Sequence, residues 1–443
     1  MNTNFKKAIL AAMSATLLAV NSAQASDWAG ATGNWSSNLN PGWNGTGVPN
    51  AVGAVANHGV ATTSTTTQDV VGGVTVGTIS LTNNSNNSWT ITNTNGINLN
   101  NGGTGASISN TNSNTGTTNF LFLSGGTLTL ADSLTISNTG ASTNTTGAIQ
   151  ITSVIAGSGD VTFSNVSTAL SQVNSIRMVT ATNTFTGAVL LQKGTVTTNQ
   201  TTVFGSVSNA VTLGQSGQGS AAILSTSSTA NIANPITVAS GSGGTLAIGS
   251  TSTAGFTGFS GTTTLNGDLN VTSLSTGSVT TGNTLTLSGA ISGNGSLTKI
   301  GTGSATLSNG TNSYIGGTVV STGNLRATAS GALGTGSVTI AAGAALGLST
   351  GVTNPNFIDD LASVLLNGST SRLNLAFTGT ETVGALTING AAFGPGTYGT
   401  ADNAQLTGTG TLTVVPEPST YVMLIGAMGM MALVVRRKAA VRA

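Results

Sequence analysis

The single histidine and a thin set of carboxylates are the residues with which this chain could perform acid–base, nucleophilic or metal chemistry. The 443 residues include one His, ten Asp and Glu together, and no Cys. A nucleophilic triad needs a base that activates its nucleophile, and His58, between Asn57 and Gly59, is the one histidine that could serve. Its place in a polar N-terminal loop favours a surface or turn position instead. Without cysteine, the chain has neither disulfides nor thiolate ligands for zinc.

Hydrolysis of a glycosidic bond requires a pair of carboxylates. In this chain the carboxylates are instead spread along the sequence. The one adjacent pair, Asp359-Asp360, follows Pro355-Asn356-Phe357-Ile358 and precedes Leu361. We expect this pair to cap a short irregular segment, because a calcium loop brings together several oxygen ligands and the sequence shows no such series. We therefore predict no catalytic residue, no cofactor and no metal site, and we expect that the protein is not an enzyme.

The middle of the chain carries little charge. Charged residues make up 5% of the sequence, where ordinary globular proteins have about 25%. Between Ser26 and Val415, five basic residues stand against nine acidic ones, because the other basic residues lie at the two ends. Nucleic-acid binding needs clustered Lys and Arg that neutralise phosphates. We therefore expect no nucleic-acid partner.

Short runs that alternate apolar and hydroxyl residues fill the body of the chain, residues 70–414. Examples are Thr127-Leu128-Thr129-Leu130, Leu134-Thr135-Ile136 and Val338-Thr339-Ile340. Alternation with a period of two places the apolar side chains on one face of a strand and the hydroxyls on the other. Clusters of Gly, Asn and Ser between the runs supply turns; one of them, Asn83-Asn84-Ser85-Asn86-Asn87, could stack into an amide ladder or form an exposed loop. The body is predicted to be all-β.

Internal repetition indicates how the strands are arranged. The stretch Asn183-Thr184-Phe185-Thr186-Gly187 recurs as Asn312-Ser313-Tyr314-Ile315-Gly316, and Phe204-Gly205 recurs at the same offset as Leu333-Gly334. Repeats of this kind are typical of solenoids, in which stacked turns satisfy one another's backbone groups. We expect about 20–24 residues in each turn.

Both ends of the chain have the composition of targeting segments. Residues 1–25 have the parts of a signal peptide: two lysines, an apolar stretch, and Ala23 and Ala25 at the small-residue positions of a signal-peptidase site. At the other end, the apolar run Tyr421–Val435 precedes the basic residues Arg436, Arg437 and Lys438. As a helix this run would span roughly 22 Å, less than the ~30 Å hydrocarbon core of a bilayer. We expect a single apolar helix that anchors the chain transiently in the inner membrane.

The order of the C-terminal parts resembles the PEP-CTERM sorting signal. In residues 415–443, Pro416-Glu417-Pro418 precedes the apolar run and the basic residues close it. The resemblance implies an exosortase-like processing enzyme that cleaves near Pro416, Glu417 and Pro418. It also implies delivery to the envelope, outer surface or extracellular matrix of a Gram-negative-type bacterium. A plain single-pass membrane anchor is the alternative interpretation.

A second resemblance concerns the body. Leu297–Gly303, Tyr314–Thr318 and Gly323-Asn324-Leu325 resemble the autotransporter-associated β-strand repeat, with the best copy at about 295–326 and degenerate copies elsewhere. The resemblance implies a passenger-like solenoid over 70–414 that folds as a right-handed parallel β-helix. The stretch Phe377–Leu386 looks like the family's closing segment.

The N-terminal segment, residues 26–69, contains three of the four tryptophans. Asn34-Trp35, Trp43 and Val48-Pro49-Asn50 look like the Trp-containing opening of the same family. Exposed indole rings could stack on sugars. The favoured interpretation is a hydrophobic cap over the first turn, because the open end of a solenoid needs one.

Three functions are compatible with these observations to different degrees. The leading one is a structural or adhesive protein of the cell surface, associated with exopolysaccharide or biofilm; its partners would be signal peptidase, an exosortase-like enzyme and polysaccharide or other surface proteins. A β-helix polysaccharide lyase or hydrolase is the second, and the scarcity of charge argues against it. An autotransporter adhesin is the third; it would require a C-terminal membrane β-barrel, whereas this chain ends in an apolar run and basic residues.

Overall fold

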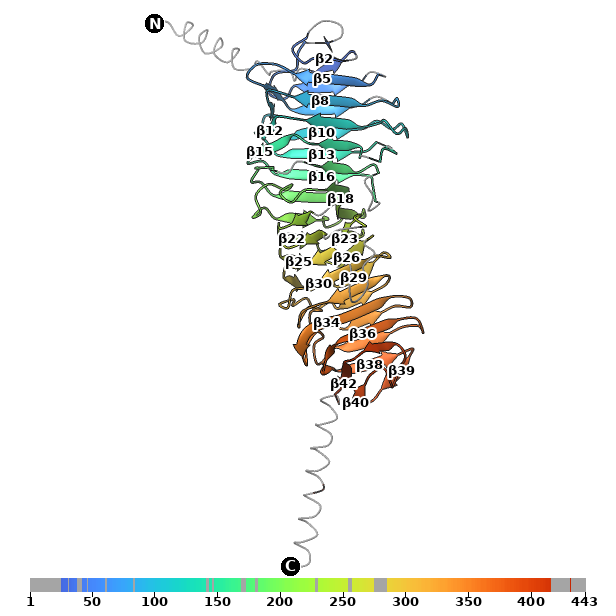
Figure 1. The fold of residues 1–443 in the computed structure, drawn as a ribbon. Coiled ribbons are helices and arrows are strands. Elements are labelled where there is room, and N and C mark those ends of the chain that lie inside the picture. Colours follow the sequence, from blue (N-terminus) through green and yellow to red (C-terminus); the bar gives the residue numbers. More distant parts are fainter. Residues whose placement is uncertain are drawn as a thin grey trace, which may run out of the picture. The chain divides into compact units, whose positions relative to one another are not determined.

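The computed structural model describes residues 25–30, 32–37, 42–45, 47–59, 62–82, 84–140, 143–145, 147–168, 173–179, 182–227, 230–253, 257–274, 285–415 and 431. The chain divides into two compact units: unit 1 comprises the residues up to Gly214 with Ser220–Ser225, and unit 2 comprises Gln215–Gly219 and the residues from Thr226 onward. Each unit is a stack of short β-strands (Figure 1). The prediction of an all-β solenoid is confirmed. Its division into two units was not predicted.

Unit 1 is built from strands of two to ten residues. Their bounds are β1 (Ala25–Trp28), β2 (Gly33–Asn34), β3 (Trp43–Gly45), β4 (Val55–His58), β5 (Ser64–Gln68), β6 (Val74–Val76), β7 (Thr78–Leu81), β8 (Trp89–Asn93), β9 (Ile97–Leu99), β10 (Ala106–Asn110), β11 (Leu121–Ser124), β12 (Thr127–Leu130), β13 (Leu134–Asn138), β14 (Ile149–Ile151), β15 (Val154–Gly157), β16 (Val161–Asn165), β17 (Ile176–Met178), β18 (Val189–Thr198) and β19 (Val211–Leu213), with β20 (Ala222–Thr226) at the boundary.

In unit 1 each strand from β7 to β17 pairs in parallel with the strand three before it. Each turn of the solenoid therefore contributes one strand to each of three parallel sheets. The first sheet contains the run β4, β7, β10, β13 and β16; the second contains β5, β8, β11, β14 and β17; the third contains β6, β9, β12 and β15. The segment expected to form the cap thus already contributes to the parallel stack, since β1 pairs in parallel with β4, and β2 with β5.

The turns of unit 1 vary in length. Val74 pairs with Ile97, a turn of 23 residues that matches the prediction, and other turns are longer. Ser107 pairs with Thr78 and with Thr135, which sets turn lengths of 29 and 28 residues, where about 20–24 were predicted. The extra residues lie in polar loops such as 111–119, whose side chains bond to the loop of the preceding turn. Asn112 donates to the Ser85 carbonyl oxygen at 2.8 Å, and the Ser113 hydroxyl donates to Asn84 at 3.0 Å. These bonds let a long loop remain ordered without apolar residues.

Alternation within each strand fills the interior. In β10, β13 and β16 the burial alternates strictly, with Ile108, Ile136 and Phe163 stacked inside. At the end of these strands Asn110, Asn138 and Asn165 are buried in register. Each amide satisfies backbone groups; Asn165, for example, donates to the Thr195 carbonyl oxygen and accepts the Ser167 N–H. An asparagine ladder therefore exists at these three positions, whereas Asn84 and Asn86 bond to Ser113 and Thr118.

Unit 2 contains the remaining strands. Their bounds are β21 (Asn231–Ile232), β22 (Ile236–Val238), β23 (Leu246–Ser250), β24 (Thr257–Phe259), β25 (Thr263–Leu265), β26 (Leu269–Ser273), β27 (Leu285–Leu287), β28 (Ile291–Gly293), β29 (Leu297–Ile300), β30 (Ser304–Leu307), β31 (Thr318–Val320), β32 (Asn324–Ala327), β33 (Val338–Ile340), β34 (Ala345–Thr353), β35 (Ser363–Leu366), β36 (Arg372–Thr378), β37 (Thr380–Val383), β38 (Ala385–Ile388), β39 (Ala391–Phe393), β40 (Gly396–Tyr398), β41 (Leu406–Gly408) and β42 (Thr411–Val414).

Unit 2 stacks its strands in parallel as unit 1 does. One sheet runs β21-β24-β27-β30-β32-β34-β36-β41, and another includes β23, β26, β29, β31, β33, β35 and β38. The register pairs Thr264 with Ser292, a turn of 28 residues, and Thr298 with Val319, a turn of 21. In both units the shorter turns match the predicted length and the longer turns exceed it.

The sequence repeat corresponds to one local structure that occurs in each unit. The Asn183 amide accepts the Ile155 N–H at 2.8 Å and donates to the Val203 carbonyl oxygen at 2.7 Å. The Asn312 amide makes the same pair of bonds, at 2.8 Å to Ile291 and 2.7 Å to Ala332. In both copies the side chain clamps three consecutive turns together, which explains why Asn recurs at the start of the repeat.

Antiparallel strands lie at the first and last turns of the described chain. At the N-terminal side, β3 pairs antiparallel with β1 and places Trp43 opposite Trp28. At the C-terminal side, β39 pairs antiparallel with β38, and β40 with β42. Such hairpins cover backbone groups that an open solenoid end would expose.

Candidate functional site

The predicted processing sites adjoin the folded body. Ala25 is the first residue of β1, where it is exposed and pairs with Val55. Ala23, Pro416–Pro418 and the basic residues Arg436, Arg437 and Lys438 lie outside the described residues. The folded body extends to Val415, whose N–H donates to the Val383 carbonyl oxygen at 3.1 Å. Pro416 follows directly in the sequence.

The predicted apolar helix Tyr421–Val435 is described only at Met431. A membrane span requires a long apolar helix, and the part of the chain that the structure describes contains none that qualifies.

The tryptophans and His58 form one buried cluster in unit 1. Trp28, Trp35 and Trp89 are fully buried, and Trp43 is 4% exposed. The Trp35 and Trp43 rings lie 4.8 Å apart between centroids in an edge-to-face arrangement, which is a favourable geometry for aromatic pairs. Buried rings cannot stack on sugars, so the cap interpretation fits the cluster and the sugar-binding alternative does not.

The expectation of a surface or turn position for His58 is wrong. His58 is the last residue of β4, fully buried, with its ring stacked on Trp89 at 5.6 Å. Its Nε2 lies 2.7 Å from the Thr62 carbonyl oxygen. Burial lowers the pKa of His58, because the charged imidazolium is poorly solvated there. The neutral ring therefore acts as a packing residue of the cap.

Lys299 is the buried cation of unit 2. Its side chain points inward from β29, and Nζ donates to the carbonyl oxygens of Ile300 and Gly301 at 2.8 Å each and of Thr322 at 3.3 Å. Burial lowers its pKa to about 8. These three carbonyls belong to two consecutive turns, so Lys299 fastens one corner of the solenoid. The sequence pattern around Lys299 did not indicate this role.

Glu381 is the buried acid of the same unit. From β37 its carboxylate accepts the N–H groups of Phe357 at 3.1 Å and Ile358 at 2.7 Å. Burial raises the pKa of Glu381 to about 7, although these two hydrogen bonds act in the opposite direction. The carboxylate thus holds the loop before Asp359-Asp360 against the solenoid. In that loop Asp359 accepts the Leu361 N–H at 3.0 Å, a local cap of the predicted kind.

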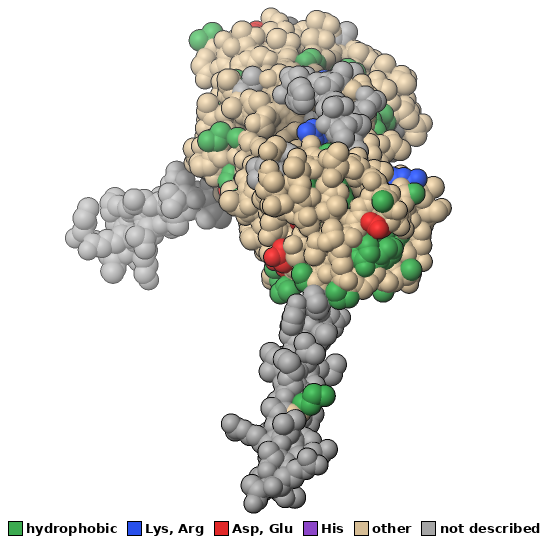
Figure 2. All heavy atoms as spheres, turned by 60° about the horizontal axis from the view of Figure 1, so that its bottom comes forward, with side chains coloured by type: hydrophobic (Ala, Val, Ile, Leu, Met, Phe, Trp, Pro, Cys, Tyr) green, Lys and Arg blue, Asp and Glu red, His purple; other side chains and the backbone are tan. Residues whose placement is uncertain are grey.

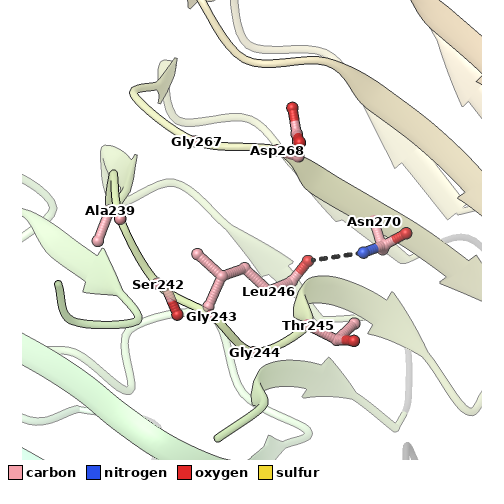
Figure 3. Close-up of a pocket in the computed structure, with 10 residues that line it drawn as sticks. Ala239, Ser242, Gly243, Gly244, Thr245, Leu246, Gly267, Asp268 and Asn270 are labelled. Atoms are coloured by element: carbon pink, nitrogen blue, oxygen red, sulfur yellow. Dashed lines mark hydrogen bonds between the residues drawn. The ribbon is translucent and has the colours of Figure 1, made fainter. Parts of the chain in front are cut away.

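One hollow on unit 2 is polar. It has a volume of about 370 Å³ and is lined by Gly-rich backbone from 241–244 and by side chains from the next turn, among them Asp268 and Asn270 (Figure 3). Asp268 already accepts the N–H and hydroxyl of Ser296, at 2.9 and 2.8 Å. The Asn270 amide donates to the Leu246 carbonyl oxygen at 3.4 Å. The hollow therefore offers neutral hydrogen-bonding groups and one carboxylate that is partly occupied.

The accessible face of the protein is dominated by uncharged polar groups. On the face shown in Figure 2, a few charged side chains and scattered hydrophobic ones lie on a surface made mostly of uncharged polar side chains and backbone. Among the described residues, no three His, Asp or Glu side chains gather as potential metal ligands. The buried ionisable groups His58, Lys299 and Glu381 each bond to backbone groups.

Comparison with known proteins gives one match. Residues 414–438 match the model of the PEP-CTERM protein-sorting motif. Neither curated proteins nor solved structures gave a match. The matched residues begin at Val414, the last residue of β42, and include every part of the predicted sorting signal from Pro416 to Lys438. The chain is therefore a β-solenoid protein that carries a C-terminal PEP-CTERM sorting motif, which implies export, processing by an exosortase and sorting to the cell surface.

Proposed function

We propose that this protein is a non-enzymatic structural or adhesive component of the cell surface or extracellular matrix, associated with exopolysaccharide. The observation that carries the proposal is the combination of a sorting motif at 414–438 with a solenoid whose surface is rich in hydroxyls and poor in charge. Hydroxyl groups offer weak hydrogen bonds that add up over a long polymer. We further propose that the solenoid is right-handed and that its turns are autotransporter-associated β-strand repeats, since β29–β32 contain the best copy of that pattern.

The proposal is tested on the cells that produce the protein. Deletion of the gene should reduce cell aggregation, and the purified protein should bind the polysaccharide of those cells. No binding together with unchanged aggregation would refute the surface role. Release of reducing sugars from acidic polysaccharides would instead show that the protein is an enzyme.

The sorting step has a separate test. We expect intact mass and C-terminal sequencing of the protein from envelope and medium to show loss of residues 1–25 and cleavage near Pro416-Glu417-Pro418. A variant with Pro416→Ala, Glu417→Ala and Pro418→Ala should keep its tail. A tail retained by the wild-type protein would favour the plain membrane anchor.

A further inference from the structure

One outer face of unit 1 carries a regular array of hydroxyl groups. The register of β7, β10, β13 and β16 aligns two columns of side chains across four turns. A third column follows directly after the strands, where the N–H groups of residues 111, 139 and 166 bond to the preceding turn. We call these positions the hydroxyl grid. Its columns are Thr78, Ser107, Thr135 and Thr162; Ser80, Ser109, Ser137 and Ser164; and Thr82, Thr111 and Thr139, with Val166 at the twelfth position.

Strand geometry fixes the spacing of the grid. Neighbouring strands lie ~4.8 Å apart, and residues two apart on one face are separated by ~6.6 Å along the strand. The residues between the columns point inward; Ile79, Ile108 and Ile136 are fully buried. The hydroxyls are therefore held at regular intervals by a packed core, which lowers the conformational cost of binding.

Most hydroxyls at the centre and the C-terminal side of the grid have no partner within the described chain. At the other side, Ser80 is buried and donates to Asn57 at 2.8 Å, and Ser107 donates to Thr78 at 3.1 Å. The structure gives no such bond for the side chains of Ser109, Thr135, Ser137, Thr139, Thr162 and Ser164. These six groups remain available both as donors and as acceptors.

The charge and size of the grid select its partner. The four strands contain no charged residue, and beside them one cation, Lys193, pairs with Ser164 from the next turn. A lone cation is not the cluster of charges that an ionic polymer needs. The area of the grid is on the order of 200 Å² by strand spacing, far below the roughly 800 Å² that each partner buries in a stable protein interface. A narrow chain whose units present neutral hydroxyls at repeated intervals fits both observations. We propose that the hydroxyl grid binds a neutral, linear polysaccharide, an inference that rests on the proposed surface function and assigns it a site.

The test compares two variants of the full-length chain that lose the same groups. The grid variant carries Thr135→Val, Thr162→Val and Ser137→Ala. The control variant carries Thr237→Val, Thr264→Val and Ser292→Ala, which remove a single outward column on β22, β25 and β28 of unit 2. Co-sedimentation with regenerated cellulose is the binding assay, with alginate as the charged competitor. Far-UV circular dichroism confirms that both variants fold.

We expect the grid variant to bind cellulose about tenfold more weakly, since three hydrogen bonds are lost, and the control variant to bind as the wild type does. Val166→Thr, which completes the grid, should strengthen binding. Equal binding by the grid variant and the wild type would overturn the site and leave the surface function standing. A wild type that binds neither cellulose nor the polysaccharide of its own cells would overturn both. Grid-dependent dimerisation without cellulose binding would assign the face to a second copy and overturn the proposal.

Discussion

Gly289 provides the most direct test of how the turns of unit 2 are held together. Its backbone approaches the turn below so closely that an added Cβ would press against the Gly261 carbonyl group, 2.5 Å from its carbon and 2.8 Å from the Ser260 oxygen. Real Cβ atoms essentially never lie within 3.0 Å of such atoms. Gly289→Ala must therefore separate two turns that are joined by the Ser288 N–H bond to the Phe259 carbonyl oxygen, at 2.9 Å.

The expected cost follows from these contacts. Overpacking that shifts backbone costs typically 1–3 kcal/mol, and a weakened backbone hydrogen bond adds about 1 kcal/mol, so Gly289→Ala should destabilise the protein by about 3 kcal/mol. Gly394→Ala is the matched control, because nothing lies within 4 Å of its added Cβ and its φ is not positive. At an unstrained position Gly→Ala stabilises by about 0.4–1 kcal/mol through the unfolded chain.

Urea denaturation followed by far-UV circular dichroism measures both variants. With a slope of about 1–3 kcal/mol per molar urea, the midpoint of the transition that Gly289→Ala affects should fall by at least about 1 M. The midpoint for Gly394→Ala should stay level or rise slightly. If both variants had the same midpoint, the close stacking of turns at Gly289 would be wrong.

Three further predictions concern the buried ionisable groups. Because the pKa of His58 is held below its ordinary 6.5, the unfolded chain binds the proton more readily, and unit 1 should lose stability as the pH falls below about 6.5; Trp fluorescence reads this transition, and His58→Phe should remove the pH dependence. The pKa of Glu381 rises from 4.5 to about 7, so the stability of unit 2 should decrease by ~3 kcal/mol between these values as the pH rises, and Glu381→Gln should flatten the profile in denaturation measured across that range. The pKa of Lys299 falls from 10.5 to about 8, so stability should increase from pH 8 to 10.5; the same increase in a Lys299→Met variant would refute this assignment.

The period-two alternation of apolar and polar residues contained more information about burial than the sequence-based predictions used. It identified the all-β body correctly, and the recurrence of Asn183 and Asn312 marked two copies of one clamp. The same period of two, extended to polar residues, places His58 on the face of Ala56 and Lys299 on the face of Leu297, and both are buried. The burial of His58 and Lys299 was not predicted because an ionisable side chain was expected to be exposed. Such a side chain can be buried when a few backbone groups bond to it.

Turn length and the division into units depend on pairings that local sequence does not encode. Thr135 pairs with Ser107, 28 residues earlier, because the polar loops between strands bond to the loops of neighbouring turns. An asparagine in a loop looks the same in sequence whether it faces water or a carbonyl of the next turn. Thus Asn110, Asn138 and Asn165 form a buried ladder, and the more conspicuous asparagines at 84 and 86 bond to Ser113 and Thr118 instead.

The buried ionisable groups also help to explain how a solenoid with so few charged residues stays folded. His58, Lys299 and Glu381 bond to backbone groups at or next to the corners of turns: Lys299 to three carbonyl oxygens and Glu381 to two N–H groups. A turn corner leaves backbone groups outside the strand ladders, and each of these must find a partner when buried. A single ionisable side chain satisfies two or three of them at once, at the cost of a shifted pKa. On this reasoning the interior ionisable side chains maintain the stack, and the outer face, which is poor in charge, presents the hydroxyls that we propose contact polysaccharide.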